Sequence, residues 1–140
     1  MIGKTIIVAL LIVLIAGCDS PVFEPEFTVT KDSIHSAVKT IVKAKGIYIE
    51  AHKTPVDETI YLSLSVQLIN AEHIPSSEDS IIKIQKKVAT KIKSFLKDQL
   101  QFDEYKVIFV KRDTARALSA TITHEEGMFT HTFRAADLKN

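Results

Sequence analysis

The chain of 140 residues contains one cysteine, no tryptophan and only four glycines. A single cysteine excludes an intrachain disulfide, so packing must hold the fold together. Four glycines leave little material for a phosphate-binding loop, and neither G-x-G-x-x-G nor a P-loop occurs. The patterns G-x-S-x-G, H-E-x-x-H and C-x-x-C are also missing from the sequence. We therefore expect a non-catalytic protein.

The numbers of basic and acidic residues are also nearly equal. The sequence has 18 basic and 17 acidic residues, for a formal net charge of +1. Proteins that bind nucleic acids in general need a net basic surface to contact phosphates. We therefore expect no nucleic-acid partner.

The N-terminal segment carries the strongest signal in the sequence. Lys4 precedes a continuous apolar run from Ile6 to Ala16. This run is shorter than the roughly 20 residues that a membrane-spanning helix needs. A cationic start before a short apolar core is typical of a cleaved secretory signal peptide. The segment ends in Ile15-Ala16-Gly17-Cys18, which resembles the lipobox of bacterial lipoproteins.

The resemblance covers residues 1–18 and implies how the protein is processed and located. Residues 1–17 would be removed as the signal peptide, and Cys18 would carry covalent acyl chains such as palmitate. The implied location is the extracytoplasmic face of the cell membrane, held by the lipid, with no other cofactor. Asp19 resembles the inner-membrane retention signal of enteric Gram-negative lipoproteins, which would place the domain in the periplasm under that sorting rule.

The remaining chain predicts a tether and one domain. Pro21 and Pro25 oppose helix formation between residues 19 and 27, so residues 18–29 are interpreted as the lipidated cysteine and a tether. Residues 30–140 are long enough for one domain.

Hydrophobic periodicity predicts an α+β fold for this domain. We expect a single, mostly antiparallel sheet of about five strands, with one long amphipathic helix packed on it and a shorter N-terminal helix. Residues 60–68 alternate between apolar and polar side chains, as a sheet with one buried face requires. The pattern does not determine the strand order. The predicted helices span residues 32–45 and 76–100, and the predicted strands span residues 47–52, 59–70, 104–112, 117–125 and 128–134.

Local signals predict where these elements begin and end. Gly46 is expected to stop the first helix, and Ser76 with Asp79 resembles a capping box for the second. Residues 54–57 are expected to form a turn. Glu126-Gly127 suits a tight turn between the last two strands.

The long predicted helix has a face rich in lysine and poor in acids. No acidic residue occurs between Ser80 and Lys97. A helix exposed only to solvent usually mixes charges, because oppositely charged pairs at i, i+4 stabilise it. The face therefore predicts a docking surface for an anionic partner: lipid headgroups, an acidic protein or a polyanionic polymer. Alternatively, Glu72, Asp103 and Glu104 neutralise it from nearby loops. The candidate residues are Lys83, Lys86, Lys87, Lys91, Lys93 and Lys97.

Five histidines occur, and two of them form a weak candidate metal site. Pairing His124 with Phe129 across the predicted turn would place His124 and His131 diagonally on one sheet face. Two imidazoles and a nearby carboxylate are a minimal ligand set. The same face carries apolar side chains, which favours partly buried histidines without a metal.

Three functions therefore remain open for the domain. We expect it to bind another envelope protein, with the lysine-rich face as the first candidate surface. One alternative is a metal- or small-ligand-dependent activity at His124 and His131. The other is a structural accessory subunit whose sheet edge pairs with a partner strand. The sequence does not determine the oligomeric state.

Overall fold

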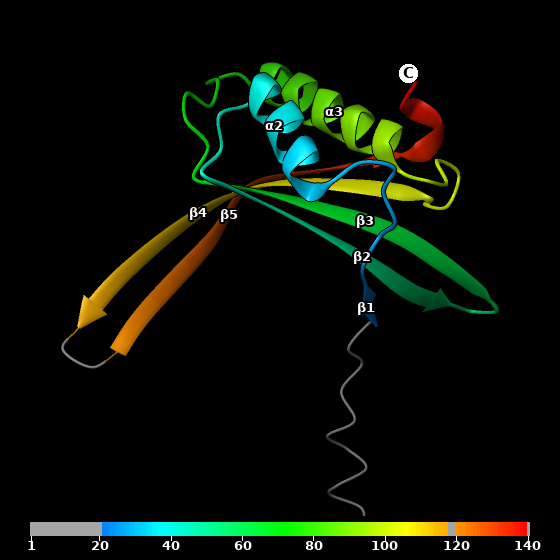
Figure 1. Cartoon of the computed structure of the whole chain (residues 1–140), viewed down its shortest axis with the longest axis horizontal. Helices are drawn as coiled ribbons and strands as arrows, with labels where there is room; N and C mark the ends of the chain where they lie inside the picture. The colour runs from blue at the N-terminus through cyan, green and yellow to red at the C-terminus, as the bar shows by residue number, and fades with distance from the viewer. Residues whose placement is uncertain (1–20, 118–119, 140) are drawn as a thin grey trace, which may run out of the picture.

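The strands form one sheet, and the two longer helices cover the same face of it (Figure 1). A computed structural model describes residues 21–117 and 120–139. The strands, in their order across the sheet, are β1 (Val22–Phe23), β2 (Gly46–Val56), β3 (Thr59–Ile69), β4 (Glu104–Ala117) and β5 (Ala120–Arg134). The helices are α2 (Lys31–Ile41), α3 (Glu78–Phe95) and the short 3-10 helix η1 (Ala135–Asp137).

The predicted α+β class is confirmed, but the sheet is mixed. Three pairings are antiparallel, namely β1–β2, β2–β3 and β4–β5. The central pairing, β3–β4, is parallel. The chain leaves β3, crosses the sheet as α3 and returns to the end at which β3 began. Such a crossover makes the two strands that it joins parallel.

The core lies between the two helices α2 and α3 and the face of the sheet that they cover. Leu64, Val66 and Leu68 are fully buried, as their alternation predicts. Val88 and Ile92 of α3 are fully buried against this face. Burying one such side chain contributes about 1.5–3 kcal/mol. Ile60 differs from the prediction and is 64% exposed, because the β2–β3 hairpin extends beyond the helices.

The α3 helix is shorter than predicted and begins at a different cap. Its N-cap is Ser77 rather than Ser76, and the Ser77 hydroxyl accepts a hydrogen bond from the Ser80 backbone N–H at 3.3 Å. The helix ends at Phe95, before the predicted Leu100. The C-cap residue Leu96 has extended backbone, and the Phe95 carbonyl accepts a hydrogen bond from the Thr28 backbone N–H at 2.8 Å.

Two predicted boundaries around β2 are also wrong. The first helix ends at Ile41 rather than at residue 45, and Gly46 opens β2 instead of capping the helix. Gly46 pairs with Ile69, and a side chain there would lie against that isoleucine. The turn was predicted at residues 54–57, but residues 54–56 continue β2. The hairpin closes at Asp57, which has a positive φ of 53°.

The predicted turn at Glu126-Gly127 does not exist, because both residues lie inside the continuous strand β5. Phe109 pairs with Phe129, whereas Val110 pairs with Gly127. Met128 is therefore an extra residue, and the strand forms a β-bulge there. A glycine inside a strand often marks such a bulge, which bends the strand.

Beyond this bulge the β4–β5 hairpin becomes a two-stranded arm. The pairing of β3 with β4 ends at Ile69 and Val110, and Figure 1 shows the arm leaving the body. The side chain of Asn70 extends the β3–β4 contact by one step. It donates to the Arg112 carbonyl at 2.8 Å and accepts from the Arg112 N–H at 2.7 Å.

The end of the predicted tether belongs to the domain. Val22 and Phe23 pair with β2, and the Phe23 ring stacks on Phe102 with ring centroids 6.1 Å apart. Phe27 forms an isolated bridge with Leu96. From residue 21 onward, this segment is therefore not a free spacer. Its prolines favour extended backbone, and that conformation serves an edge strand as well as a linker.

One buried amide joins α3 to the bulge. Gln85 is 1% exposed and lies on the apolar stripe of the helix. Its Nε2 donates to the backbone carbonyls of Val107 at 3.0 Å and Phe129 at 3.3 Å. A single polar side chain thus holds β4 and β5 beneath the helix at the base of the arm.

We expect Gln85→Leu to lower the free energy of unfolding by about 1–3 kcal/mol, because two carbonyls would lose their donor. Urea titration would measure this change. The control is Gln67→Leu, which alters a half-buried glutamine of β3 and should have little effect. If the two variants were equally stable, the Gln85 contacts would contribute nothing.

Candidate functional site

The outer face of α3 presents four lysines to solvent. Ile81, Val88 and Ile92 pack toward the sheet. Residues about half a turn away must then point outward, because a helix repeats every 3.6 residues. The four outward lysines are exposed and are Lys83, Lys86, Lys87 and Lys91.

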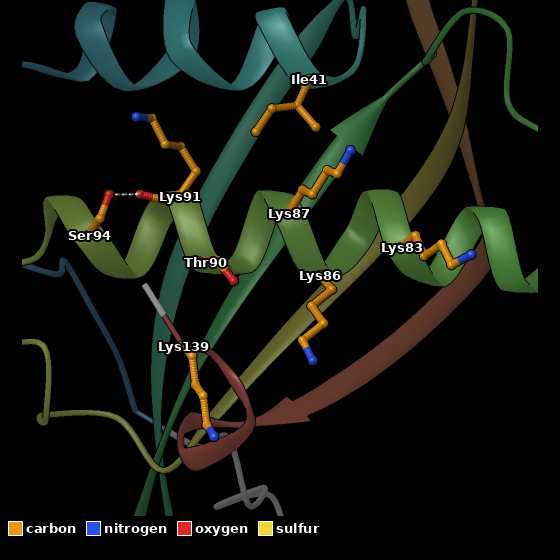
Figure 2. A pocket seen from close by; sticks show the side chains of 8 residues that line it. All are labelled: Ile41, Lys83, Lys86, Lys87, Thr90, Lys91, Ser94 and Lys139. Atoms are coloured by element: carbon orange, nitrogen blue, oxygen red, sulfur yellow. Dashed lines mark hydrogen bonds between the residues drawn. The ribbon is translucent and has the colours of Figure 1, made fainter.

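These lysines surround an open hollow of about 680 Å³. In Figure 2, Lys87 and Lys91 point toward α2, and Lys83 points along α3 toward its N-terminal end. Lys86 lies on the other side of α3, and it lines a neighbouring hollow together with Lys139. Ile41 of α2 adds an apolar wall. We call this the lysine surface, and its lining residues are Ile41, Lys83, Lys86, Lys87, Thr90, Lys91, Ser94 and Lys139.

The positive charge of this surface is not neutralised within residues 21–117 and 120–139. None of its lysines forms an ion pair with an acidic residue of that part of the chain. The loop acids proposed as neutralisers do not reach it, and Asp103 instead accepts the Leu62 N–H at 2.9 Å. Asp137 lines a neighbouring hollow with Lys86 and Lys139 without pairing with either.

This arrangement costs the isolated protein some stability. Lys83 and Lys87 are four residues apart, as are Lys87 and Lys91. Each like-charged pair at this spacing destabilises a helix by about 0.2–0.5 kcal/mol. One contact partly offsets this cost: the Lys91 ammonium lies 5.0 Å from the centre of the Phe95 ring, in a favourable cation–π contact. An anionic partner would relieve this repulsion.

The two remaining candidate lysines have structural contacts elsewhere. Lys93 is half-buried, and its Nζ donates to the carbonyls of Ala135 at 2.8 Å and Leu138 at 3.0 Å. Lys97 lies beyond the helix and pairs with Glu26 at 3.0 Å. These two residues fix the C-terminal segment and the segment after β1. Neither lines the hollow.

Lys139 is the lysine of this surface that sequence patterns missed. It lies far from α3 in the sequence and reaches the helix because η1 turns the chain back toward it (Figure 2). No local pattern indicates this return, which depends on the contacts of Lys93 with the η1 segment.

The predicted placement of the histidines is wrong. His124 pairs with Asp113 and His131 pairs with Val107, so both lie on β5 rather than on facing strands. Six residues of strand lie between them, which separates them by roughly 20 Å, too far to share a metal. Within residues 21–117 and 120–139, no three His, Cys, Asp or Glu residues are arranged to hold a metal ion. His131 instead contacts Phe133, with ring centroids 4.6 Å apart.

Within the described part of the chain, two side chains outside this surface have displaced pKa values. Burial, with a smaller effect of Asp98, raises the pKa of Tyr105 to about 12. The Tyr105 hydroxyl has no hydrogen-bond partner among the described residues. A hydrogen bond with Tyr48 and the nearby Glu125 carboxylate raise the pKa of Arg112. Tyr105 therefore stays neutral and Arg112 stays charged at neutral pH.

Searches against protein-family models, curated proteins and solved structures found no match. Among the described residues, no helix is long and apolar enough to cross a membrane. The functional argument therefore rests on the lysine surface and on the N-terminal sequence.

The structure predicts opposite consequences for two lysines of α3. We expect Lys93→Met to lower the free energy of unfolding by about 1.5–3 kcal/mol, because charged donors to two carbonyls are lost. Lys87→Met should leave stability unchanged or raise it slightly, because it removes repulsion. Urea unfolding of both variants would measure the difference, and equal losses would contradict these assignments.

Proposed function

We propose that this protein is a bacterial lipoprotein, anchored through Cys18, whose extracytoplasmic domain binds an acidic segment of another envelope protein. The observation that carries the docking proposal is the lysine surface: five lysines around one open hollow, without an ion pair in the described part of the chain. The lipobox-like sequence carries the anchoring proposal.

The chemistry of the hollow favours a protein segment over a uniformly charged polymer. Ile41 and the aliphatic stems of the lysines supply apolar contact area, and each stem ends in an ammonium group. Thr90 and Ser94 supply hydroxyl groups at the same site. A peptide that combines carboxylates with apolar side chains satisfies both features, whereas a polyanion uses only the charge. The long lysine side chains allow adjustment to the partner.

A second candidate function rests on strand β5. It pairs with β4 on one edge, and its other edge has no strand partner among the described residues. An exposed edge of this length can add a strand from another chain. The arm beyond Val110 also exposes Ile122, which is 62% accessible. Strand addition at β5 is therefore the alternative route to a partner.

The anchoring proposal predicts the fate of Cys18→Ala. Without the thiol, no acyl chain can be attached, and the precursor should remain uncleaved or mislocalised. Metabolic labelling with a fatty acid, together with mass spectrometry of the membrane fraction, would measure this. Normal processing and acylation of the variant would overturn the lipobox assignment.

The docking proposal predicts that charge reversal on α3 removes the partner. We expect Lys86→Glu with Lys87→Glu and Lys91→Glu to abolish an in-cell crosslink to an acidic segment of an envelope protein. Mass spectrometry would identify the crosslinked peptides. In vitro, a fluorescent peptide of alternating glutamate and leucine should bind the parent protein and fail to bind the variant. The affinity for the parent protein should fall as the salt concentration rises.

The matched control changes Lys39, Lys43 and Lys45 to Glu. These lysines are exposed on and after α2, do not line the hollow, and alter the net charge equally. The control should keep the crosslink. A partner retained by the α3 variant would move the interface to the β5 edge, and the absence of any protein crosslink would reject the docking proposal.

A further inference from the structure

The fold determines which part of the domain lies closest to a lipid attached to Cys18. The Pro21 carbonyl accepts a hydrogen bond from the Lys53 backbone N–H at 3.2 Å, and Val22 pairs with His52. The chain therefore has a fixed position from Pro21 onward. Cys18 lies three residues earlier, and three residues span at most about 11 Å when fully extended. A lipidated Cys18 must keep Pro21 close to the bilayer.

Pro21 and the lysine surface lie on opposite sides of the domain. β1 is the edge strand of the sheet, and Figure 1 shows it below β2, farther from α2 and α3 than β2 is. The lysines project from the face of α3 that points away from the sheet. The sheet and a helix about 10–12 Å across therefore separate them from the anchored side. Screening reduces charge interactions beyond about 8 Å at physiological ionic strength.

The sheet face beside Pro21 exposes apolar side chains of its own. Val22 is 59% exposed, and Val56 and Tyr61 are each 46% exposed. Strand register places them on one face: Val22 pairs with His52, Tyr61 pairs with Thr54, and Val56 follows these two positions along β2 with period two. The other face of the same strands carries the buried residues Ala51 and Leu64.

These three side chains suit the surface of a bilayer. Tyrosine is enriched where membrane meets water, since its ring is apolar and its hydroxyl is polar. Scattered single apolar residues on a surface need no explanation, but these three share one face next to the chain that leads to Cys18. That face meets the membrane first when the connecting chain is short.

We infer that the sheet face carrying Val22, Val56 and Tyr61 lies on the membrane, so that the lysine surface points away from the bilayer. This inference rests on the proposed lipidation of Cys18. It also makes the docking proposal more specific: the acidic partner approaches from the side opposite the anchor, and the headgroups of the protein's own membrane are not the ligand of α3.

Lysine footprinting would test this orientation. The full chain is expressed in a bacterium, purified with its lipid and reconstituted into phosphatidylcholine vesicles. A water-soluble acetylating reagent then labels exposed lysines, and peptide mass spectrometry compares vesicles with detergent-solubilised protein. Lys106, which shares a hollow with His52 and Thr54 on the anchored face, should lose reactivity several-fold. Lys86 and Lys87 should remain equally reactive.

Paired variants separate the apolar contact from the anchor. Val56→Glu with Tyr61→Glu should restore the reactivity of Lys106 in vesicles. Ile122→Glu changes an exposed apolar residue on the arm and should not. Adding phosphatidylglycerol to the vesicles should leave Lys86 and Lys87 reactive, because the lysine surface faces away.

The other outcomes would overturn the inference in distinct ways. Shielding of Lys86 and Lys87 with anionic lipid would show that α3 faces the bilayer. If Lys106 were as reactive in vesicles as in detergent, as Lys86 and Lys87 are expected to be, the domain would have no preferred orientation. An intact mass without acyl chains would instead reject the anchoring proposal, and the orientation with it. Docking of an acidic peptide in solution does not depend on any of these results.

Discussion

The packing of α3 across the sheet is the interaction on which the rest of the structure depends. Its buried face, including Val88 and Ile92, covers the core and makes the crossover that places β4 parallel to β3. Gln85 holds β4 and β5 through two backbone carbonyls at the bulge from which the arm departs. The same helix presents its lysines on the opposite side. One element therefore organises both the core and the candidate binding surface.

This dual role explains why the lysines of α3 are not equivalent. Helical geometry sends Lys86 and Lys87 outward, where repulsion from neighbouring lysines is tolerated. Lys93 lies near the C-terminal end of α3 and binds the carbonyls of the returning chain. That contact helps to position the segment containing Lys139, which adds a fifth lysine to the surface. Lys93 is therefore not part of the lysine surface, but its contacts help to position Lys139, which is.

The sequence predicted helices and strands of strong hydrophobic periodicity correctly, but it predicted their ends less well. The alternation in β3 and the apolar stripe of α3 were confirmed because each depends on which side chains one layer can bury. Gly127 was wrongly assigned to a turn because a glycine suits either a tight turn or a strand bulge. That error also misplaced His124 relative to His131. Cap positions such as Ser77 depend on local hydrogen bonds that adjacent serines can form equally well.

The sequence by itself determined the α+β class, a lysine-rich helix and a lipobox-like start, since these depend on composition and local period. Only the tertiary structure decided which lysines share a hollow, because Ile41 and Lys139 come from distant parts of the chain. It also decided that Pro21 lies on the side of the sheet opposite the lysines. β1 is a strand of two residues, too short to show a period, and its place depends on pairing with β2.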